Sequence, residues 1–346
     1  MNKKKKIIII LVSILTFILI LFSIIMFLLS RVSNESEKVE FNISSGTSTV
    51  KIIKDLKENN LIRSELLSKI YIKLSGKTSL KAGVYMLNRN MSTIDIIDNL
   101  NDGKTLDNTV SITFKPGYKV SNYAKDIKDK LGIDESVFLS TINDLEYLNT
   151  LISKYWFLTD EIISDKIYYA LEGYLYPDTY SFYKTASSKD IIEKMLDNTE
   201  KKLNKYKDSI NKSNYSVHDI LTIASIIANE SKFSEDRSVV SQVIYKRLSL
   251  NMSLGMDVTT YYGVRKDLTE DLTQSDLNSV NGYNTRNTSF LGLPVGPICN
   301  MSTESIEASL NPSNTDYVYF YADVKTGKLY FANTYSEFLK LKEIYG

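Results

Sequence analysis

The sequence is poor in the residues that build disulfides and metal clusters. Its 346 residues include a single cysteine, Cys299, and a single histidine, His218. One cysteine permits no internal disulfide, and one histidine makes a zinc cluster implausible, because zinc sites use several Cys and His ligands. The sequence therefore indicates neither a disulfide framework nor a zinc site, and the cysteine count does not fix a cellular compartment.

The chain also lacks an excess of charge of either sign. It has 42 Lys and Arg against 41 Asp and Glu, a formal net charge of +1. Four of the positive charges are Lys3 to Lys6, and the remainder without them is three charges negative. Such a surface offers no basic field for a nucleic acid, and the glycine-rich stretch 292–297 lacks the lysine of a phosphate-binding loop. We therefore expect no nucleic-acid partner.

One long hydrophobic run is present near the N-terminus. Ile7–Leu29 is 23 residues long and contains no charged side chain. As a helix it would extend about 34 Å, enough for the hydrocarbon core of a bilayer. A cleaved signal peptide is the alternative, but the run is long for one, and residues 28–33 offer no small-residue cleavage pattern. We predict a retained, single-pass helix in the cell membrane.

The flanks of this run predict its orientation. Lys3 to Lys6 precede it, and positive flanks stay cytoplasmic, so residues 1–6 form a cytoplasmic tail and the chain from about Arg31 onward is extracytoplasmic. No cysteine follows the run that could carry a lipid anchor. The polar residues 30–38 are predicted to be a linker.

The segment after the linker has the pattern of a small mixed domain. Residues 64–74 carry apolar side chains at helical spacing, and Ser92 with Asp95 should cap another helix that Gly103 ends. Together with strand-like stretches between the helices, this pattern predicts an α+β module over residues 39–105.

The rest of the chain is long enough for a second, larger domain. Alternating apolar and polar residues predict a strand over 110–114, and residues 317–324 with 328–333 predict a hairpin. Several amphipathic helices lie between them. We expect residues 106–346 to form a larger α+β domain, which completes an α+β fold class with an N-terminal transmembrane helix.

The strongest helical pattern of this larger domain lies at residues 218–232. Ser216 and Asp219 form a loose capping-box start. Apolar residues then recur at the spacing of a helix face that packs on a core. They are Ile220, Ile223, Ala224 and Ile227.

Glu230 follows Ile227 by three residues, which places its carboxyl at the edge of this apolar face. Burial there would raise its pKa, and a raised pKa suits a general acid near neutral pH. A glutamate at a helix end is more often a solvated surface charge. Periodicity alone leaves both interpretations open.

A resemblance favours the first interpretation. Residues 221–231, LTIASIIANES, resemble the helix that carries the catalytic glutamate of the YceG-like endolytic murein transglycosylases (MltG). Further similar stretches follow the family's order and extend over nearly the whole chain. They are residues 171–180 (LEGYLYPDTY), 240–263, 283–285 (YNT), 292–298 (GLPVGPI) and 317–322 (YVYFYA).

The resemblance implies a membrane-anchored lytic transglycosylase that acts on peptidoglycan glycan strands. Glu230 would protonate the oxygen between N-acetylmuramic acid and N-acetylglucosamine, then act as base on the muramic C6 hydroxyl, giving 1,6-anhydro ends. No metal and no organic cofactor would be needed. Nascent strands would be the substrate and cell-wall synthesis proteins the partners. Residues 39–105 would be a LysM-like module, either contacting glycan or serving as a spacer.

Further residues are candidates for contacts with the sugar. Asp257 is one, and Tyr283, Asn284 and Thr285 offer donors and acceptors, although an asparagine next to glycine is more often a turn former. Glu172, in the stretch 171–180, is a candidate for a supporting acid or a turn residue.

The sequence also departs from the family pattern. The family usually has asparagine at the position of Lys246, glutamine at that of Gly255 and proline at that of Val258. These differences keep open a non-catalytic wall-binding or scaffold protein of the same fold. A third possibility is a hydrolase with Asp257 as its second carboxylate, because hydrolases commonly use two. Lys246, if near Glu230, would oppose a raised pKa.

Overall fold

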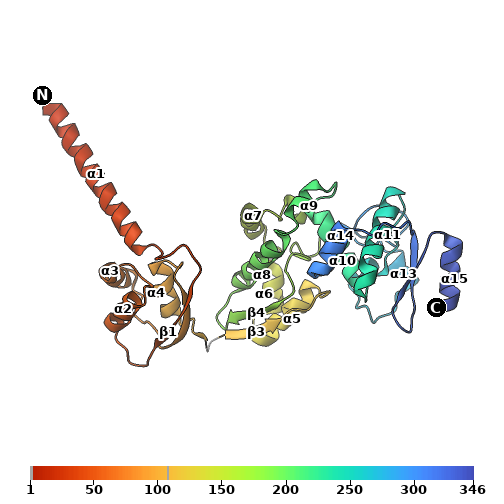
Figure 1. The fold of residues 1–346 in the computed structure, drawn as a ribbon, viewed down its shortest axis with the longest axis horizontal. Coiled ribbons are helices and arrows are strands. Elements are labelled where there is room, and N and C mark those ends of the chain that lie inside the picture. The colour runs from red at the N-terminus through yellow and green to blue at the C-terminus, as the bar shows by residue number, and fades with distance from the viewer. Residues whose placement is uncertain (1–2, 107–108) are drawn as a thin grey trace. The chain divides into compact units, whose positions relative to one another are not determined.

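The computed structural model describes residues 3–106 and 109–346, which divide into two compact units. Unit 1 is Met1–Val110 with Tyr183–Thr185, and unit 2 is Ser111–Phe182 with Ala186–Gly346. Both mix helices with strands (Figure 1), which confirms the α+β class. The predicted domain boundary at residues 105–106 lies close to the division after Val110.

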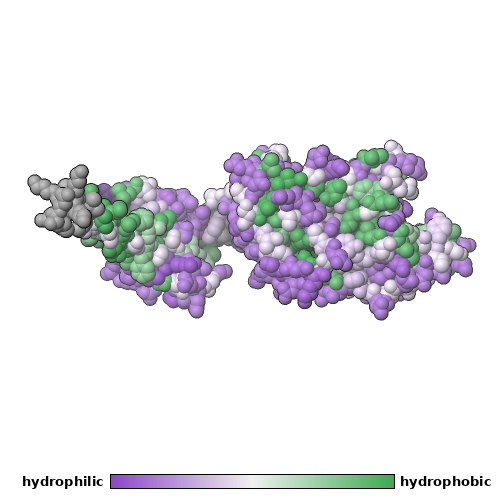
Figure 2. Space-filling view, turned by 90° about the horizontal axis from the view of Figure 1, so that it is seen from above, coloured by the Kyte–Doolittle hydropathy of each residue, from purple (hydrophilic) through white to green (hydrophobic). Residues whose placement is uncertain are grey.

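The N-terminal hydrophobic run is a single helix, α1 (Lys3–Leu29). Within it, Leu11–Leu29 is long and apolar enough to cross a membrane, and none of its most apolar window is buried in the protein. Phe17 is 67% exposed and Phe27 58%. Figure 2 shows the described part of this helix as a hydrophobic surface. An unpacked apolar helix is typical of a membrane anchor or a signal sequence.

The remainder of unit 1 packs around one small core. β1 (Lys38–Ile43) leads through α2 (Thr49–Glu58) and α3 (Glu65–Ser75) to β2 (Gly83–Asn88), and α4 (Thr93–Asp102) follows. β1 and β2 are antiparallel, with Lys38 opposite Asn88 and Ile43 opposite Gly83. The largest core side chains come from every element. They include Phe41, Ile53, Leu56, Ile72, Tyr85 and Ile97.

The caps predicted for the last of these helices are present. The Ser92 side chain accepts from the backbone N–H of Asp95, and the Asp95 carboxylate accepts from the backbone N–H of Ser92. Gly103 ends the helix in the left-handed conformation, at φ 73°, which glycine adopts without strain. Local sequence therefore determines both ends of α4.

Unit 2 begins with a pair of strands covered by helices. β3 (Thr109–Thr113) pairs with β4 (Thr179–Tyr183), and between them lie α5 (Val120–Leu131), α6 (Glu135–Thr141) and α7 (Leu145–Lys154) with a short 3-10 turn, η2 (Asp160–Ile162). α8 (Ser188–Leu203) and α9 (Lys207–Lys212) complete this part.

The second part of unit 2 is arranged around α10 (Val217–Glu230), which lies against α11 (Arg237–Ser249), α12 (Asp257–Gly263) and α14 (Thr303–Leu310) (Figure 1). The short η3 (Ser234–Asp236) and α13 (Gln274–Leu277) lie in its connections. β5 (Tyr319–Ala322) and β6 (Leu329–Ala332) form the predicted antiparallel hairpin, and α15 (Tyr335–Tyr345) closes the chain.

Candidate functional site

Glu230 is the last residue of α10. A capping box between Ser216 and Asp219 fixes the start of the helix, and every residue from Ile220 to Ile227 is buried. The helix then emerges from the core, so that Glu230 is half-buried. The carboxyl therefore extends from a rigid, packed helix to the edge of the protein interior, as the apolar stripe predicted.

The surroundings of Glu230 favour its protonated form. Burial is the largest cause and the negative charge of Asp257 the next, and the pKa of this carboxyl is raised to about 7. Arg286, the backbone N–H of Val258 and Arg247 act in the opposite direction. A carboxyl with a pKa near 7 holds a proton in about half of the molecules at neutral pH, so it can act as acid in one step and as base in the next.

Asp257, the first residue of α12, pairs with Arg286. The Arg286 Nε donates to the Asp257 Oδ1 at 2.5 Å, and the two side chains are 45% and 51% exposed. Sequence analysis did not identify Arg286. Its position directly after the 283–285 motif is the signal that could have pointed to it.

Tyr283 and Asn284, two of the predicted sugar-binding residues, are completely buried. The Tyr283 ring packs against those of Tyr168 and Tyr262, with centroids 4.9 and 4.7 Å apart. The Asn284 Oδ1 accepts from the Thr260 Oγ1 at 2.6 Å, and its amide donates to backbone carbonyls of the preceding loop. In this structure both side chains support the protein interior, and neither presents open donors to a ligand.

Thr285 is buried too, and it holds the start of α12. Its Oγ1 accepts from the Met256 N–H at 3.0 Å and contacts the Thr259 Oγ1 at 2.8 Å. Its carbonyl accepts from the Gly255 N–H at 3.0 Å. The segment 283–285 therefore positions Asp257 and Arg286, because it is bonded to the residues on both sides of Asp257.

Glu172 lies in a different network from Glu230. Its carboxylate is buried and accepts from the Val120 N–H at 3.0 Å, the Tyr262 hydroxyl at 3.1 Å and the Asn300 amide at 3.2 Å. Burial raises its pKa to about 8. The position at the N-terminus of α5 suits a negative charge, because unpaired backbone N–H groups point there. The structure thus places Glu172 as an internal link between α5, α12 and the segment around Asn300.

The structure shows what surrounds two of the positions that depart from the family pattern. Lys246 pairs with Asp316 at 2.5 Å, and the strongest charge effects on the pKa of Glu230 come from Asp257, Arg286 and Arg247. Gly255 has φ +60°, and a side chain there would meet the Arg247 guanidinium at 3.2 Å. Glycine therefore suits this turn better than a larger residue.

Arg247 joins three elements around the site. Its Nη1 donates to the Leu254 carbonyl, its Nε donates to the Val318 carbonyl at 2.7 Å, and its guanidinium lies 5.3 Å from the centre of the Tyr319 ring. Arg247 belongs to α11. Its contacts therefore attach the loop before α12 and the residue before β5 to that helix.

Replacing Arg247 by alanine should lower the free energy of unfolding by about 2 to 6 kcal/mol, because two partly buried carbonyls each lose a donor at a cost of about 1 to 3 kcal/mol. Denaturant unfolding measures this change. Lys246→Ala is the matched control one residue away. Its ion pair joins side chains that are 31% and 77% exposed, so less than about 1 kcal/mol should be lost. Equal losses in the two variants would contradict the role given to Arg247.

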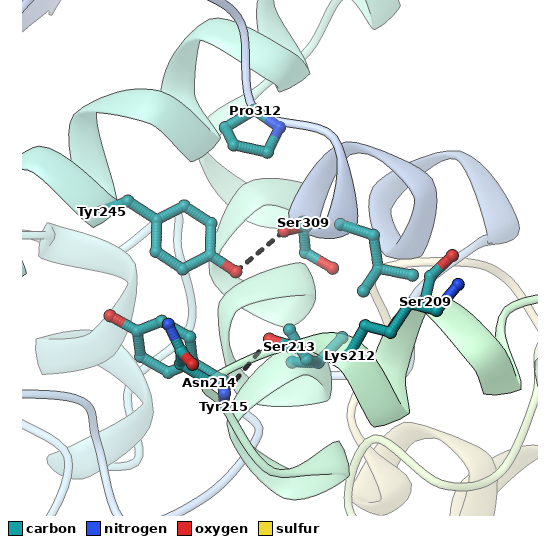
Figure 3. Close-up of a pocket in the computed structure, with 10 residues that line it drawn as sticks. Ser209, Lys212, Ser213, Asn214, Tyr215, Tyr245, Ser309 and Pro312 are labelled. Atoms are coloured by element: carbon teal, nitrogen blue, oxygen red, sulfur yellow. Dashed lines mark hydrogen bonds between the residues drawn. The ribbon is translucent and has the colours of Figure 1, made fainter.

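A pocket lies at the other end of α10. Tyr215, Tyr245, Ser309 and Pro312 are among the residues that line it (Figure 3). The Tyr245 hydroxyl donates to the Ser309 carbonyl at 2.8 Å across its wall. From Val217 to Glu230 the helix rises about 20 Å, so this pocket is separate from the glutamate.

No group of three or more His, Cys, Asp or Glu side chains within residues 3–106 and 109–346 is placed to hold a metal ion. His218 is bonded on both ring nitrogens inside unit 2. Its Nε2 donates to the Val295 carbonyl at 2.9 Å, which leaves Nδ1 to accept from the Tyr174 hydroxyl at 2.7 Å.

The chain is similar to known proteins over most of its length. The endolytic murein transglycosylase of Bacillus subtilis (strain 168) is 35% identical over 322 residues, covering 92% of this chain and 88% of that protein. The protein of the same name from Streptococcus pneumoniae serotype 2 (strain D39 / NCTC 7466) is 31% identical over 317 residues, which are 87% of this chain and 57% of the longer relative.

A solved structure resembles the fold as well. The 2.6 Å crystal structure of a YceG-like protein from Listeria monocytogenes aligns with a TM-score of 0.64 at 35% identity, covering 89% of this chain and 100% of that one. The YceG-like family itself matches residues 41–343. The match extends over most of the chain and includes α10 with Glu230, and on this ground the chain belongs to the YceG-like family.

Proposed function

We propose that this protein is a lytic transglycosylase that cleaves the bond between N-acetylmuramic acid and N-acetylglucosamine in peptidoglycan strands. The half-buried carboxyl of Glu230, with a pKa of about 7 at the end of a packed helix, is the observation that carries the proposal. The relatives named endolytic murein transglycosylase support the same substrate class.

Glu230 performs both proton transfers of this reaction. In its protonated form it gives a proton to the bridging oxygen as the bond from C1 to that oxygen breaks. The resulting carboxylate then takes the proton of the muramic C6 hydroxyl as that oxygen bonds to C1. The products are a 1,6-anhydro end and a free N-acetylglucosamine hydroxyl, so no water is consumed and Glu230 returns to its starting state.

Asp257 supports Glu230 and contacts the sugar. Its negative charge helps keep Glu230 protonated, and its side chain is half-exposed, so an oxygen remains accessible to a sugar hydroxyl. Tyr283, Asn284, Thr285 and Glu172 act on the substrate indirectly, by holding the elements that carry Asp257 and Arg286.

Mass spectrometry of digested strands separates this function from its alternatives. Anhydro ends support the transglycosylase. Reducing ends would instead indicate a hydrolase with Asp257, whose charge acts on Glu230, as second carboxylate. Intact strands would indicate a wall-binding or scaffold protein of the same fold.

The helix α1 anchors the enzyme in the cell membrane with residues 1–6 in the cytoplasm and the rest outside, next to nascent strands and the proteins that make them.

Residues 39–105 act as a LysM-like module that contacts glycan. Their separate core supports an independent module. A spacer is the alternative, and binding of glycan by unit 1 distinguishes the two.

The topology predicts the outcome of a protease experiment. Protease added to intact cells stripped of their wall should digest the bulk of the chain, because everything after α1 is outside. A cytoplasmic protein serves as the control for cell integrity. Full protection of the chain would mean that the orientation is reversed.

A further inference from the structure

The guanidinium of Arg286 has hydrogen-bonding capacity that the protein does not use. Its Nε donates to Asp257, and within the described residues it makes no second side-chain hydrogen bond. A guanidinium carries five N–H groups, so those on its terminal nitrogens remain available. The side chain is 45% exposed, and a ligand can therefore reach these groups.

Both ends of Arg286 are held in place. Its backbone N–H donates at 3.1 Å to the Asn284 Oδ1, which belongs to a completely buried side chain. Its Nε is bound to Asp257, which begins a helix that Thr285 fixes. Such a guanidinium is already oriented before a ligand arrives, and less side-chain entropy is lost on binding than for a free arginine.

The local charge favours an anion beside Glu230. The charged side chains that act most strongly on Glu230 are one aspartate and two arginines, namely Asp257, Arg247 and Arg286. When Glu230 is protonated, this group has one net positive charge. A carboxylate is the anion that the planar edge of a guanidinium binds best, together with phosphate.

We propose that Arg286 is a specificity residue that binds a carboxylate of the glycan strand's stem peptide next to Glu230. The inference rests on the proposed function for the identity of the substrate. Arg286 would select strands whose peptides carry free carboxylates over strands in which these groups are amidated.

Binding of this carboxylate would also assist the acid step. Arg286 lowers the pKa of Glu230. A bound carboxylate offsets the positive charge of Arg286, so Glu230 keeps its proton to higher pH in the complex. The groups that contribute besides Arg286 are Asp257, Arg247 and the Val258 N–H. Removing Arg286 should therefore abolish any difference in the pH profile of kcat between carboxylated and amidated strands.

Binding tests the proposal without requiring cleavage. The full chain in detergent, with Glu230→Gln to prevent turnover, is titrated with fluorescent strands whose stem peptides carry free or amidated carboxylates. The free-carboxylate strands should bind about tenfold more tightly, as expected for a charge-assisted hydrogen bond. Adding Arg286→Gln should remove this preference.

Two further variants separate recognition from structure. Arg265→Gln removes an equal charge from another exposed arginine, whose guanidinium lies over the Tyr168 ring, and should keep the tenfold preference. Asp257→Asn frees Arg286 of its partner and should keep or enlarge the preference.

Equal binding of both strands by the Glu230→Gln protein, or a preference that survives Arg286→Gln, would overturn the proposal. Absence of anhydro ends with the wild type would instead refute the proposed function and leave the binding result to stand by itself.

Discussion

Glu230→Gln should abolish cleavage of peptidoglycan strands while leaving the fold intact. Glutamine preserves the size of the side chain, but an amide can neither give the proton to the bridging oxygen nor take one from the C6 hydroxyl. General acid and base assistance is worth about 10² to 10⁴ in rate, so anhydro-end formation should fall by at least that factor.

The same change should have little effect on stability. Glu230 is half-buried and forms no ion pair within the part of the chain that the structure describes, and Arg286, which acts on its pKa, keeps Asp257 as a partner. The melting temperature and circular dichroism of the variant therefore serve as the folding control. A Glu230→Gln protein that folds normally and still cuts at the wild-type rate would rule out the single-carboxylate mechanism, and Asp257 would become the first residue to replace.

Asp257→Ala should reduce cleavage about tenfold near neutral pH and move the pH dependence. Asp257 raises the pKa of Glu230, and Arg286 lowers it. Removing Asp257 leaves Arg286 unopposed, so the pKa of Glu230 falls and the proton needed for the acid step is lost at lower pH. The alkaline limb of kcat/KM, which reports the free enzyme, should therefore shift to lower pH.

Arg286→Gln is the matched control for this shift. It removes the opposing charge from the same ion pair, so the alkaline limb should shift to higher pH. The wild type should lie between the two variants, with activity declining as pH rises through about 7. Shifts of the same sign in both variants would indicate a general loss of structure instead of an electrostatic effect on Glu230.

The sequence was informative about α10 because its determinants are local. The capping box of Ser216 and Asp219 and the stripe ending at Ile227 lie within fifteen residues of one another, and together they fix the face on which Glu230 lies. The caps of α4 and the β5–β6 hairpin were predictable for the same reason. The raised pKa of Glu230 agrees with one of the two interpretations that the stripe left open, since burial is its main cause.

The loop after α13 was not predictable in this way. Tyr283, Asn284 and Thr285 are polar residues beside glycine, a pattern typical of exposed turns, yet all three are interior. Their partners lie elsewhere in the sequence, at Tyr168 and in residues 256–260. Pairing of Arg286 with Asp257 likewise depends on how the loop returns to α12, which no local pattern encodes.

The interior position of residues 283–285 has a consequence for the thermodynamics of substrate binding. In the proposed site, an irregular loop beside the substrate would usually lose conformational freedom when a strand binds, and this loss would weaken affinity. Here the loop's side chains are already immobilised by bonds to Met256, Thr259 and Thr260. Its amides should exchange with deuterium as slowly as those of the neighbouring helices, both with and without a bound strand.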